Sequence, residues 1–354
     1  MDLKATSFFQ KSFLQYYNKN HSLEPSLTFY LMDNNNKINT LPVTLLTGFL
    51  GSGKTTLLNY ILKQNHGKRI AVIENEFGEL SIDSEFVIGA DEDIFEMSNG
   101  CICCTIRSDL IETLNRLLER HQDFDHILIE STGLASSGPI AQAFLIEDEI
   151  SKSLFLDGII TLVDAKHISN NLNEQEVAWE QIAFSHVILV NKSDLVTQLE
   201  IEQLEKQLHQ INPTAKIFTT TNAVIDLDQI LNIGGFDLKS ALETVTFNTH
   251  HHESDEAISS VSLSFPGHVD PHRLNLWLQM LLIQEGMNVF RAKGILNVEG
   301  SSEQYLFQSV YMMFEGRFDK PWGSNSPLNK MVFIGQNLNS QRLEESLKNF
   351  AISG

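Results

Sequence analysis

Cysteine is scarce in this sequence and confined to one place. The chain has three cysteines, Cys101, Cys103 and Cys104, and all of them lie in one short segment. No disulfide framework can therefore connect distant parts of the chain. Clustered thiols of this kind suit metal or redox chemistry in a reducing compartment. We expect a cytoplasmic protein.

The sequence also lacks long apolar runs and an excess of positive charge. Its longest apolar stretches, 154–163 and 186–190, are far shorter than the roughly 18 residues of a membrane span. The first forty residues contain no arginine and no apolar core, so neither a secretory signal nor a transit peptide fits. With 25 Lys+Arg against 45 Asp+Glu, the net charge of −20 repels phosphate backbones and anionic lipid. Nucleic acid and membrane are therefore not expected partners.

A chain of 354 residues is long enough for about two domains. Short apolar runs rich in Val and Ile alternate with helix-length segments, which is typical of a parallel sheet buried on both faces. The runs are 43–47, 70–74, 126–130, 158–164 and 186–190. We predict an α/β fold with a doubly wound, mainly parallel sheet over residues 41–235, preceded by an extension of unassigned role at 1–40.

The pattern changes after the turn-rich residues 232–236, where Gly234 and Gly235 are adjacent. A polar linker with a short histidine run is expected at 236–257. A smaller α+β domain is expected at 258–354, with a strand at 258–265, a helix at 271–285 and strand-like runs around 295–298 and 305–314.

A phosphate-binding motif follows the first apolar run. Residues 48–55 read G-x-x-x-x-G-K-T and precede a good helix at 56–62. In this motif backbone N–H groups surround the phosphates, Lys54 reaches the β and γ phosphates, and the Thr55 hydroxyl binds Mg²⁺. The expected nucleotide-binding residues here are Gly48, Gly51, Ser52, Gly53, Lys54, Thr55 and Thr56.

Two further segments complete the predicted nucleotide site. Asn191, Lys192 and Asp194 form N-K-S-D after a strand, and the Asp194 carboxylate can accept hydrogen bonds from both the ring N–H and the amine of guanine. This favours GTP over ATP. The run 126–130 ends in Glu130, an acid expected near the Mg²⁺ shell, and Gly133 follows it. Lys54, Thr55 and Glu130 are the expected catalytic residues.

The cysteine cluster is the candidate transition-metal site. Two or three thiolates within one turn can bind Zn²⁺, with a carboxylate completing the ligand set. No second C-x-x-C follows the cluster, and an incomplete cage suits metal exchange. The alternative is that these are small buried cysteines in a packed turn.

In order, the P-loop, E-N-E-F-G-E at 74–79, G-C-I-C-C at 100–104, E-S-T-G at 130–133 and N-K-S-D closely resemble the CobW family of P-loop GTPases. The resemblance spans about 41–350, because 291–294, 321–322 and 332–335 are similar to that family's C-terminal domain. It implies a GTP-dependent metallochaperone or metal insertase, most often for zinc, with cobalt or iron in other subgroups. It also implies that the transition-metal ligands are Cys101, Cys103, Cys104, Glu74 and Glu79.

These observations predict a GTPase whose nucleotide state controls Zn²⁺ binding and transfer to an unidentified client metalloprotein. The expected cofactors are GTP or GDP, Mg²⁺ and Zn²⁺, with Co²⁺ or Fe²⁺ as alternatives to zinc. The protein is expected to be a monomer or a dimer that forms in response to nucleotide or metal. Three alternatives stay open: a non-catalytic zinc or cobalt buffer or sensor that binds GTP, a cobalt chaperone for cobalamin synthesis, and a small-molecule kinase.

Overall fold

The computed structural model describes residues 40–74, 94–96, 105–146, 148–174, 176–234, 258–285, 288–311, 313–323, 326–350 and 352–353. The predicted linker at 236–257 and residues 1–39 of the predicted N-terminal extension lie outside these ranges. Within the helices that are described, none combines the length and the apolarity that a bilayer crossing requires.

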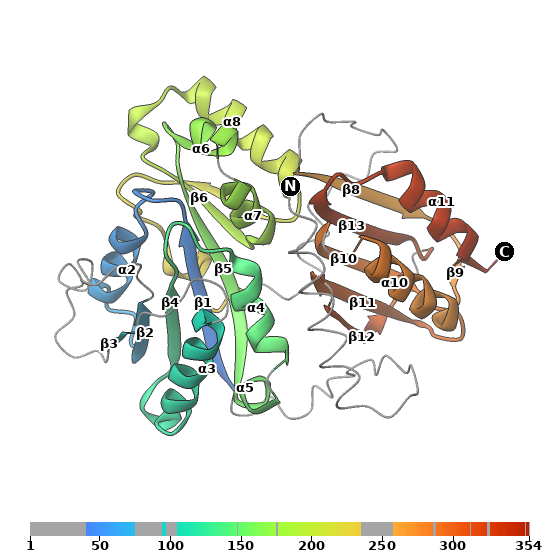
Figure 1. Ribbon diagram of the computed structural model, residues 1–354, viewed down its shortest axis with the longest axis horizontal. Coiled ribbons are helices and arrows are strands. Elements are labelled where there is room, and N and C mark those ends of the chain that lie inside the picture. Colours follow the sequence, from blue (N-terminus) through green and yellow to red (C-terminus); the bar gives the residue numbers. More distant parts are fainter. Residues whose placement is uncertain are drawn as a thin grey trace. The chain divides into compact units, whose positions relative to one another are not determined.

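A seven-stranded parallel sheet forms the first half of the described chain (Figure 1). Its strands are β1 (Leu41–Gly48), β2 (Ile70–Glu74), β3 (Ile94–Glu96), β4 (His126–Glu130), β5 (Leu154–Asp164), β6 (Val187–Asn191) and β7 (Lys216–Thr219). They lie in the order β3-β2-β4-β1-β5-β6-β7, and every neighbouring pair is parallel. Because β1 lies between β4 and β5, the chain winds to both sides of it. The predicted doubly wound α/β fold is confirmed.

The predicted strand positions are close to those in the structure. β2 and β4 have the expected bounds, β5 begins at Leu154 rather than at residue 158, and β6 begins one residue later than expected. β3 and β7 were not predicted. β7 is a partly exposed edge strand without a continuous apolar run, so its sequence carries little strand signal.

Helices connect the strands of this sheet. They are α2 (Lys54–Lys63), α3 (Thr105–Leu118), α4 (Ser137–Ile146), α5 (Asp148–Ser153), α6 (Ile168–Glu174), α7 (Glu176–Phe184) and α8 (Gln198–Ile211), with 3₁₀ turns η3 (His121–Asp123), η4 (Ser193–Leu195) and η5 (Leu227–Gln229). The start of α8 is fixed by a capping box, in which the Thr197 side chain accepts from the Glu200 N–H and the Glu200 side chain accepts from the Thr197 N–H.

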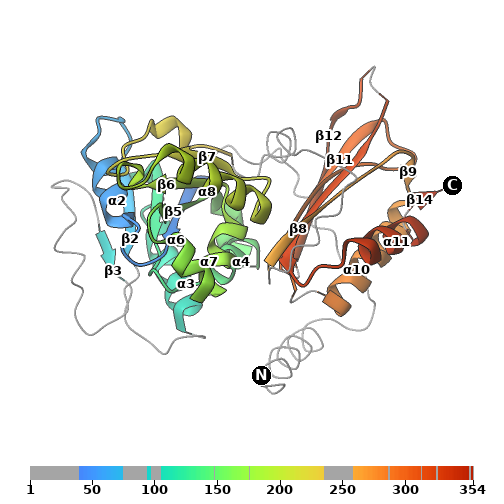
Figure 2. The same ribbon diagram turned by 90° about the horizontal axis from the view of Figure 1, so that it is seen from above.

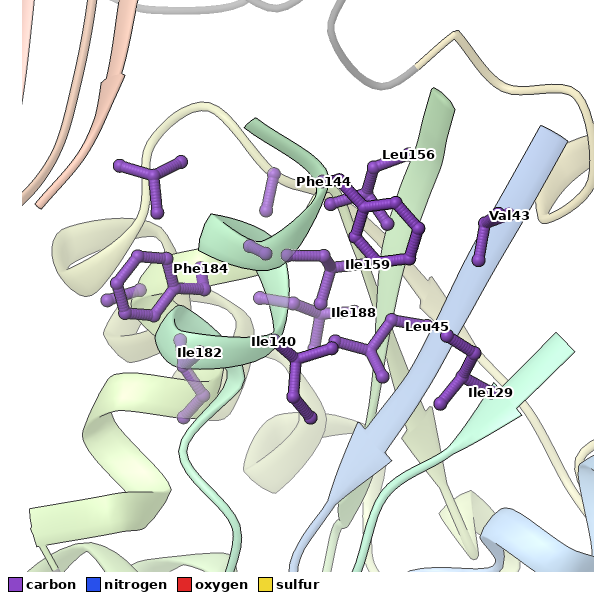
Figure 3. Packing of buried hydrophobic residues seen from close by; sticks show 14 of the residues in the cluster. Val43, Leu45, Ile129, Ile140, Phe144, Leu156, Ile159, Ile182, Phe184 and Ile188 are labelled. Atoms are coloured by element: carbon purple, nitrogen blue, oxygen red, sulfur yellow. The ribbon is translucent and has the colours of Figure 1, made fainter. Parts of the chain in front are cut away.

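The two faces of the sheet carry separate apolar cores, because successive strand residues point to opposite faces. On one face, Val43 and Leu45 of β1 pack with residues of β4, β5 and β6 and with Ile140, Phe144 and Phe184 from α4 and α7 (Figure 3). On the other face, Leu46 and its neighbours pack against Leu57, Leu58 and Ile61 of α2. This two-sided burial explains why the strands read as nearly continuous apolar runs.

A five-stranded antiparallel sheet forms the second half of the described chain, in the order β12-β11-β10-β13-β8. Its elements are β8 (Ile258–Phe265), β9 (His268–Val269), α10 (Pro271–Glu285), β10 (Val289–Asn297), β11 (Glu303–Val310), β12 (Met313–Pro321), β13 (Asn329–Gln336), α11 (Ser340–Phe350) and β14 (Ile352–Ser353). Helices α10 and α11 lie on the same face of this sheet (Figure 2). The predicted α+β class is confirmed, and β8 and α10 have the predicted bounds.

The single strand-like run expected around 305–314 is wrong. The structure divides it into the antiparallel strands β11 and β12, and Tyr311 at the turn has a left-handed backbone with φ of 49°. The residues on both sides of the turn favour strands, and the turn contains no glycine or proline to mark it.

Candidate nucleotide site

The P-loop connects the end of β1 to the start of α2, and its glycines are required by its geometry. Gly48, Gly51 and Gly53 have φ of 135°, 75° and 108°, values that residues with a Cβ rarely adopt. A Cβ on Gly53 would also lie 2.5 Å from the amide nitrogen of Asn191. The loop can therefore curl tightly in front of the N-terminus of α2, where unpaired N–H groups favour an anion.

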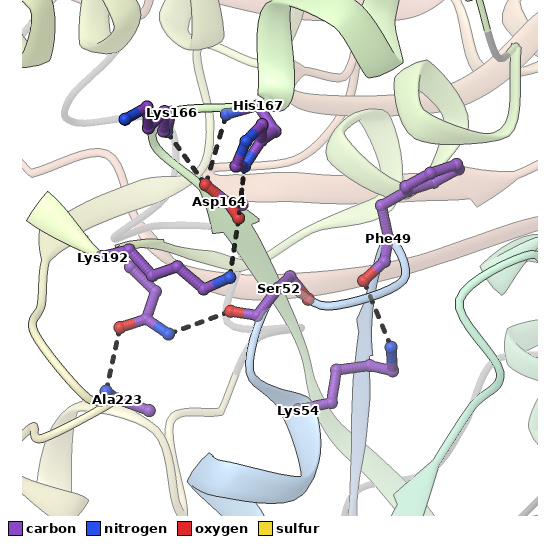
Figure 4. A network of polar contacts seen from close by, with 9 residues as sticks. Phe49, Ser52, Lys54, Asp164, Lys166, His167, Lys192 and Ala223 are labelled. Atoms are coloured by element: carbon purple, nitrogen blue, oxygen red, sulfur yellow. Dashed lines mark hydrogen bonds and ion pairs between the residues drawn. The ribbon is translucent and has the colours of Figure 1, made fainter. Parts of the chain in front are cut away.

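Lys54 is the first residue of α2, and its side chain folds back onto the P-loop. Its Nζ atom donates a hydrogen bond to the Gly48 carbonyl at 3.0 Å. It donates a second to the Phe49 carbonyl at 3.4 Å (Figure 4). The residue is 8% exposed, so a cation is held inside the loop. This is the place where the motif positions a lysine to meet phosphate oxygens.

Thr55 and Glu130 meet beside the P-loop. The Thr55 hydroxyl donates to Glu130 Oε1 at 3.0 Å, and Glu130 is the buried last residue of β4. A hydroxyl and a carboxylate are the oxygen donors that Mg²⁺ prefers. The donor set therefore fits the predicted Mg²⁺ ion, which these two side chains would hold when it is bound with nucleotide.

The segment after Glu130 lies against the P-loop. A Cβ on Gly133 would be 2.6 Å from the backbone nitrogen of Leu50, so the two loops touch at this glycine. From α7, Gln181 Nε2 donates to the carbonyls of Gly133, at 3.2 Å, and Ala135, at 3.1 Å. A change in the Gly133 loop would therefore also disturb α7.

Asn191 ties the N-K-S-D loop to the P-loop. Its Nδ2 donates to the Ser52 carbonyl at 2.9 Å, and its Oδ1 accepts from the Ala223 N–H at 2.9 Å and from the Thr220 hydroxyl at 3.2 Å. The side chain is buried, so these three bonds are protected from water. The two loops predicted to contact opposite ends of one nucleotide are thus joined.

Asp194 lies in the short 3₁₀ turn η4 and is exposed. Two hydrogen bonds anchor this turn to the segment after β7, because the Ser193 hydroxyl and N–H both donate to the Thr220 carbonyl. An exposed carboxylate on a fixed turn can accept hydrogen bonds from a base, as the sequence predicts.

Asp164 was not predicted, although it has the same signal as Glu130, an acid that ends an apolar run. It is the last residue of β5, and its Oδ2 accepts from Lys192 Nζ at 2.8 Å. Burial alone raises the pKa of the Asp164 carboxyl, but Lys192, His167 and the Lys166 N–H outweigh it and hold that pKa below its ordinary value.

Of the five predicted transition-metal ligands, one lies within the described residues. Cys101, Cys103, Cys104 and Glu79 lie outside the described residues. Glu74 is described, and it is the buried last residue of β2, directly paired in register with Glu130 of β4. Within the described ranges alone, no three His, Cys, Asp or Glu side chains converge as a metal-binding group.

Two family models match this chain. The family described as CobW/HypB/UreG, nucleotide-binding domain, matches residues 42–219, and the Cobalamin synthesis protein cobW C-terminal domain matches residues 258–351. The chain belongs to the CobW family. The predicted resemblance is confirmed over both halves of the described chain.

Named relatives of this CobW-family chain come from bacteria and eukaryotes. It is 37% identical to the zinc chaperone YjiA of Escherichia coli over 86% of this chain and 97% of that protein. It is 33% identical to the zinc-regulated GTPase metalloprotein activator 1 of Schizosaccharomyces pombe, over 83% of this chain and 81% of that protein. The crystal structure of Zn(II)-bound YjiA GTPase from E. coli matches with a TM-score of 0.73 at 32% identity, covering 88% of this chain and 99% of that one.

Proposed function

We propose that this protein is a GTP-hydrolysing metallochaperone for zinc, in which the bound nucleotide controls the affinity for the metal. Nucleotide use is supported by the P-loop, the Thr55–Glu130 contact and the N-K-S-D turn, which lie along one edge of the sheet. Zinc is supported by the names of the relatives, a zinc chaperone and a zinc-regulated GTPase. A GTPase must hold its phosphate site and its guanine site in a fixed relation. The Asn191–Ser52 hydrogen bond connects the two loops proposed for these sites.

The observation that carries the link between nucleotide and zinc is the pairing of Glu74 with Glu130. The two residues are register partners on neighbouring strands, and both are buried at the carboxyl ends of those strands. Glu130 accepts from Thr55, the predicted Mg²⁺ ligand, whereas Glu74 begins the segment that leads to the cysteines. Two carboxylates in such positions affect each other's charge and placement. In the proposal, a change in the Mg²⁺ site therefore alters the charge or placement of Glu74, the proposed zinc ligand, through its direct neighbour Glu130.

The residues of the chain have separate tasks in this mechanism. Lys54 exchanges its carbonyl partners for phosphate oxygens and stabilises the charge that develops on the transferred group. Mg²⁺, when bound, neutralises phosphate charge. In the proposal, the Thr55 hydroxyl and Glu130 orient that edge of the site, and the Gly133 N–H responds to the γ-phosphate. Asp194 recognises guanine.

Zinc is the cargo of this cycle. In the proposal, Cys101, Cys103 and Cys104 supply thiolates, and Glu74 and Glu79 supply carboxylates. GTP closes these ligands on the ion and hydrolysis loosens them. The recipient is a client metalloprotein in the cytoplasm, and the protein acts there as a monomer or as a dimer formed with nucleotide or metal.

The test is a competition titration for Zn²⁺ with a chromophoric chelator, in Mg²⁺ with GDP or with a nonhydrolysable GTP analogue. Coupling between sites must appear as different affinities. We expect the GTP-analogue state to bind Zn²⁺ at least about tenfold more tightly, which is about 1.4 kcal/mol of coupling.

Two variants sharpen this titration. Glu74→Gln should remove most of the difference between the nucleotide states while leaving GDP affinity within about twofold. Glu112→Gln, on an exposed face of α3, is the matched control and should behave like the unaltered protein. Equal Zn²⁺ affinities in the two nucleotide states would refute the proposed coupling and favour a zinc buffer that merely binds GTP.

A further inference from the structure

Asp164 lies beside the guanine loop in space although it precedes that loop by a helix pair in the chain. It ends β5, and its backbone is the register partner of Asn191, which ends the neighbouring strand β6. Lys192 follows Asn191 directly. The parallel pairing of β5 with β6 therefore brings the Asp164 carboxylate to the start of N-K-S-D.

The carboxylate of Asp164 is completely engaged by this corner of the fold (Figure 4). Its Oδ2 accepts from Lys192 Nζ at 2.8 Å and is 3.0 Å from His167 Nδ1, and its Oδ1 accepts from the N–H groups of Lys166 and His167 at 3.0 and 3.2 Å. The Asp164 side chain is only 7% exposed, whereas that of His167 is 58% exposed. A carboxylate held by its own turn is a fixed acceptor, and this one is aimed at a residue of the guanine loop.

Lys192 needs such an acceptor for two reasons. Its backbone is left-handed, with φ of 60°, a conformation that costs free energy for a residue with a Cβ. Its ammonium is also only two residues from Asp194, the carboxylate that must stay open to guanine. Without Asp164, the nearest carboxylate on its own loop would be Asp194, and an ion pair there would occupy the acceptor that reads the base.

We propose that Asp164 is a specificity-determining positioning residue for guanine nucleotides. It acts through Lys192: it holds the ammonium away from Asp194 and keeps the N-K-S-D turn in the conformation that presents Asp194 to the base. The inference rests on the guanine-nucleotide part of the proposed function and is independent of zinc.

The test is the ratio of GDP to ADP affinity, measured with fluorescent analogues of both nucleotides in Mg²⁺. The variants are Asp164→Asn, which keeps the shape and removes the charge, Lys192→Met, and the double variant. Asp125→Asn is the matched control. It breaks the exposed Arg69–Asp125 ion pair. These two residues directly precede β2 and β4, so they lie at the amino ends of the strands, away from the proposed nucleotide site.

In Asp164→Asn we expect GDP affinity to fall at least about tenfold while ADP affinity stays within about twofold, so the ratio falls about tenfold. The double variant should lose no more than the weaker-binding single variant, because both changes remove one interaction. Asp125→Asn should keep the unaltered ratio.

Three results would overturn the inference. The first is an unchanged GDP affinity in Asp164→Asn. The second is an equal fall in GDP and ADP affinity, which indicates general damage to the fold. The third is that the effects of the two single variants multiply in the double variant, which would mean that Asp164 does not act through Lys192. If the unaltered protein does not prefer GDP to ADP, the guanine part of the proposed function has failed instead.

Discussion

Acid should destabilise this protein through a histidine in the central sheet. His126, the first residue of β4, is fully buried, and its Nε2 atom is 2.9 Å from the Thr44 hydroxyl. Burial, assisted by the nearby charge of Lys68, lowers the pKa of His126 to about 4 from its ordinary 6.5. The folded protein therefore resists a proton that the unfolded chain accepts readily.

The sign and size of the effect follow from this difference. Between pH 6.5 and pH 4 the unfolded state binds more protons than the folded state, so the free energy of unfolding falls as the pH falls through this window. The pKa difference of about 2.5 corresponds to a total of about 3.4 kcal/mol, of which about 1.8 kcal/mol is lost between pH 7 and pH 5. At pH 7 the His126 side chain is neutral in both states for the most part.

The assay is urea unfolding, followed by circular dichroism, at a series of pH values for the unaltered protein and for His126→Gln. The variant keeps a hydrogen-bonding group but cannot titrate, so its curve should lose about 1.8 kcal/mol less between pH 7 and pH 5. His186, whose pKa burial also lowers, titrates in both proteins and cancels in the difference. Parallel profiles for His126→Gln and the unaltered protein would refute the reasoning.

Substitutions at three further positions test contacts that stabilise the fold. Asn191→Ala should reduce the free energy of unfolding by about 3 kcal/mol and weaken GDP binding, because it leaves buried groups such as the Ala223 N–H unpaired; an unchanged urea midpoint would contradict this. Arg291→Leu should cost about 2–4 kcal/mol, since the buried guanidinium donates to the carbonyl of Phe184 at 2.8 Å; calorimetry would show it as a lower melting temperature, and a higher one would count against the contact. Thr197→Ala should cost about 1 kcal/mol through the lost cap of α8, whereas Thr197→Ser should restore most of it.

Local patterns made much of the sheet and of the phosphate site predictable. The runs that became β2 and β4 are short, continuous and buried on both faces, so their bounds could be read from apolar residues alone. The P-loop is contiguous in sequence, and strand, glycine turn, lysine and helix follow one another directly. The N-K-S-D motif is also contiguous in sequence, and it begins at Asn191, the last residue of β6.

Features that depend on how one strand pairs with another escaped prediction. The run 305–314 divides at Tyr311 because the chain turns back there to pair β11 with β12, and pairing energy rather than a turn residue fixes the bend. The edge strand β7 is recognised only from its neighbour β6.

The sequence by itself determined the chemistry available to this protein: a lysine and a threonine in a phosphate loop, acids at the ends of apolar runs, an N-K-S-D turn and a group of cysteines. Only the tertiary structure decided which of these groups meet. Residue spacing encodes the period of a strand but not the order of strands in a sheet. That order places Asp164 beside Lys192, Glu74 beside Glu130, and Asn191 against the P-loop.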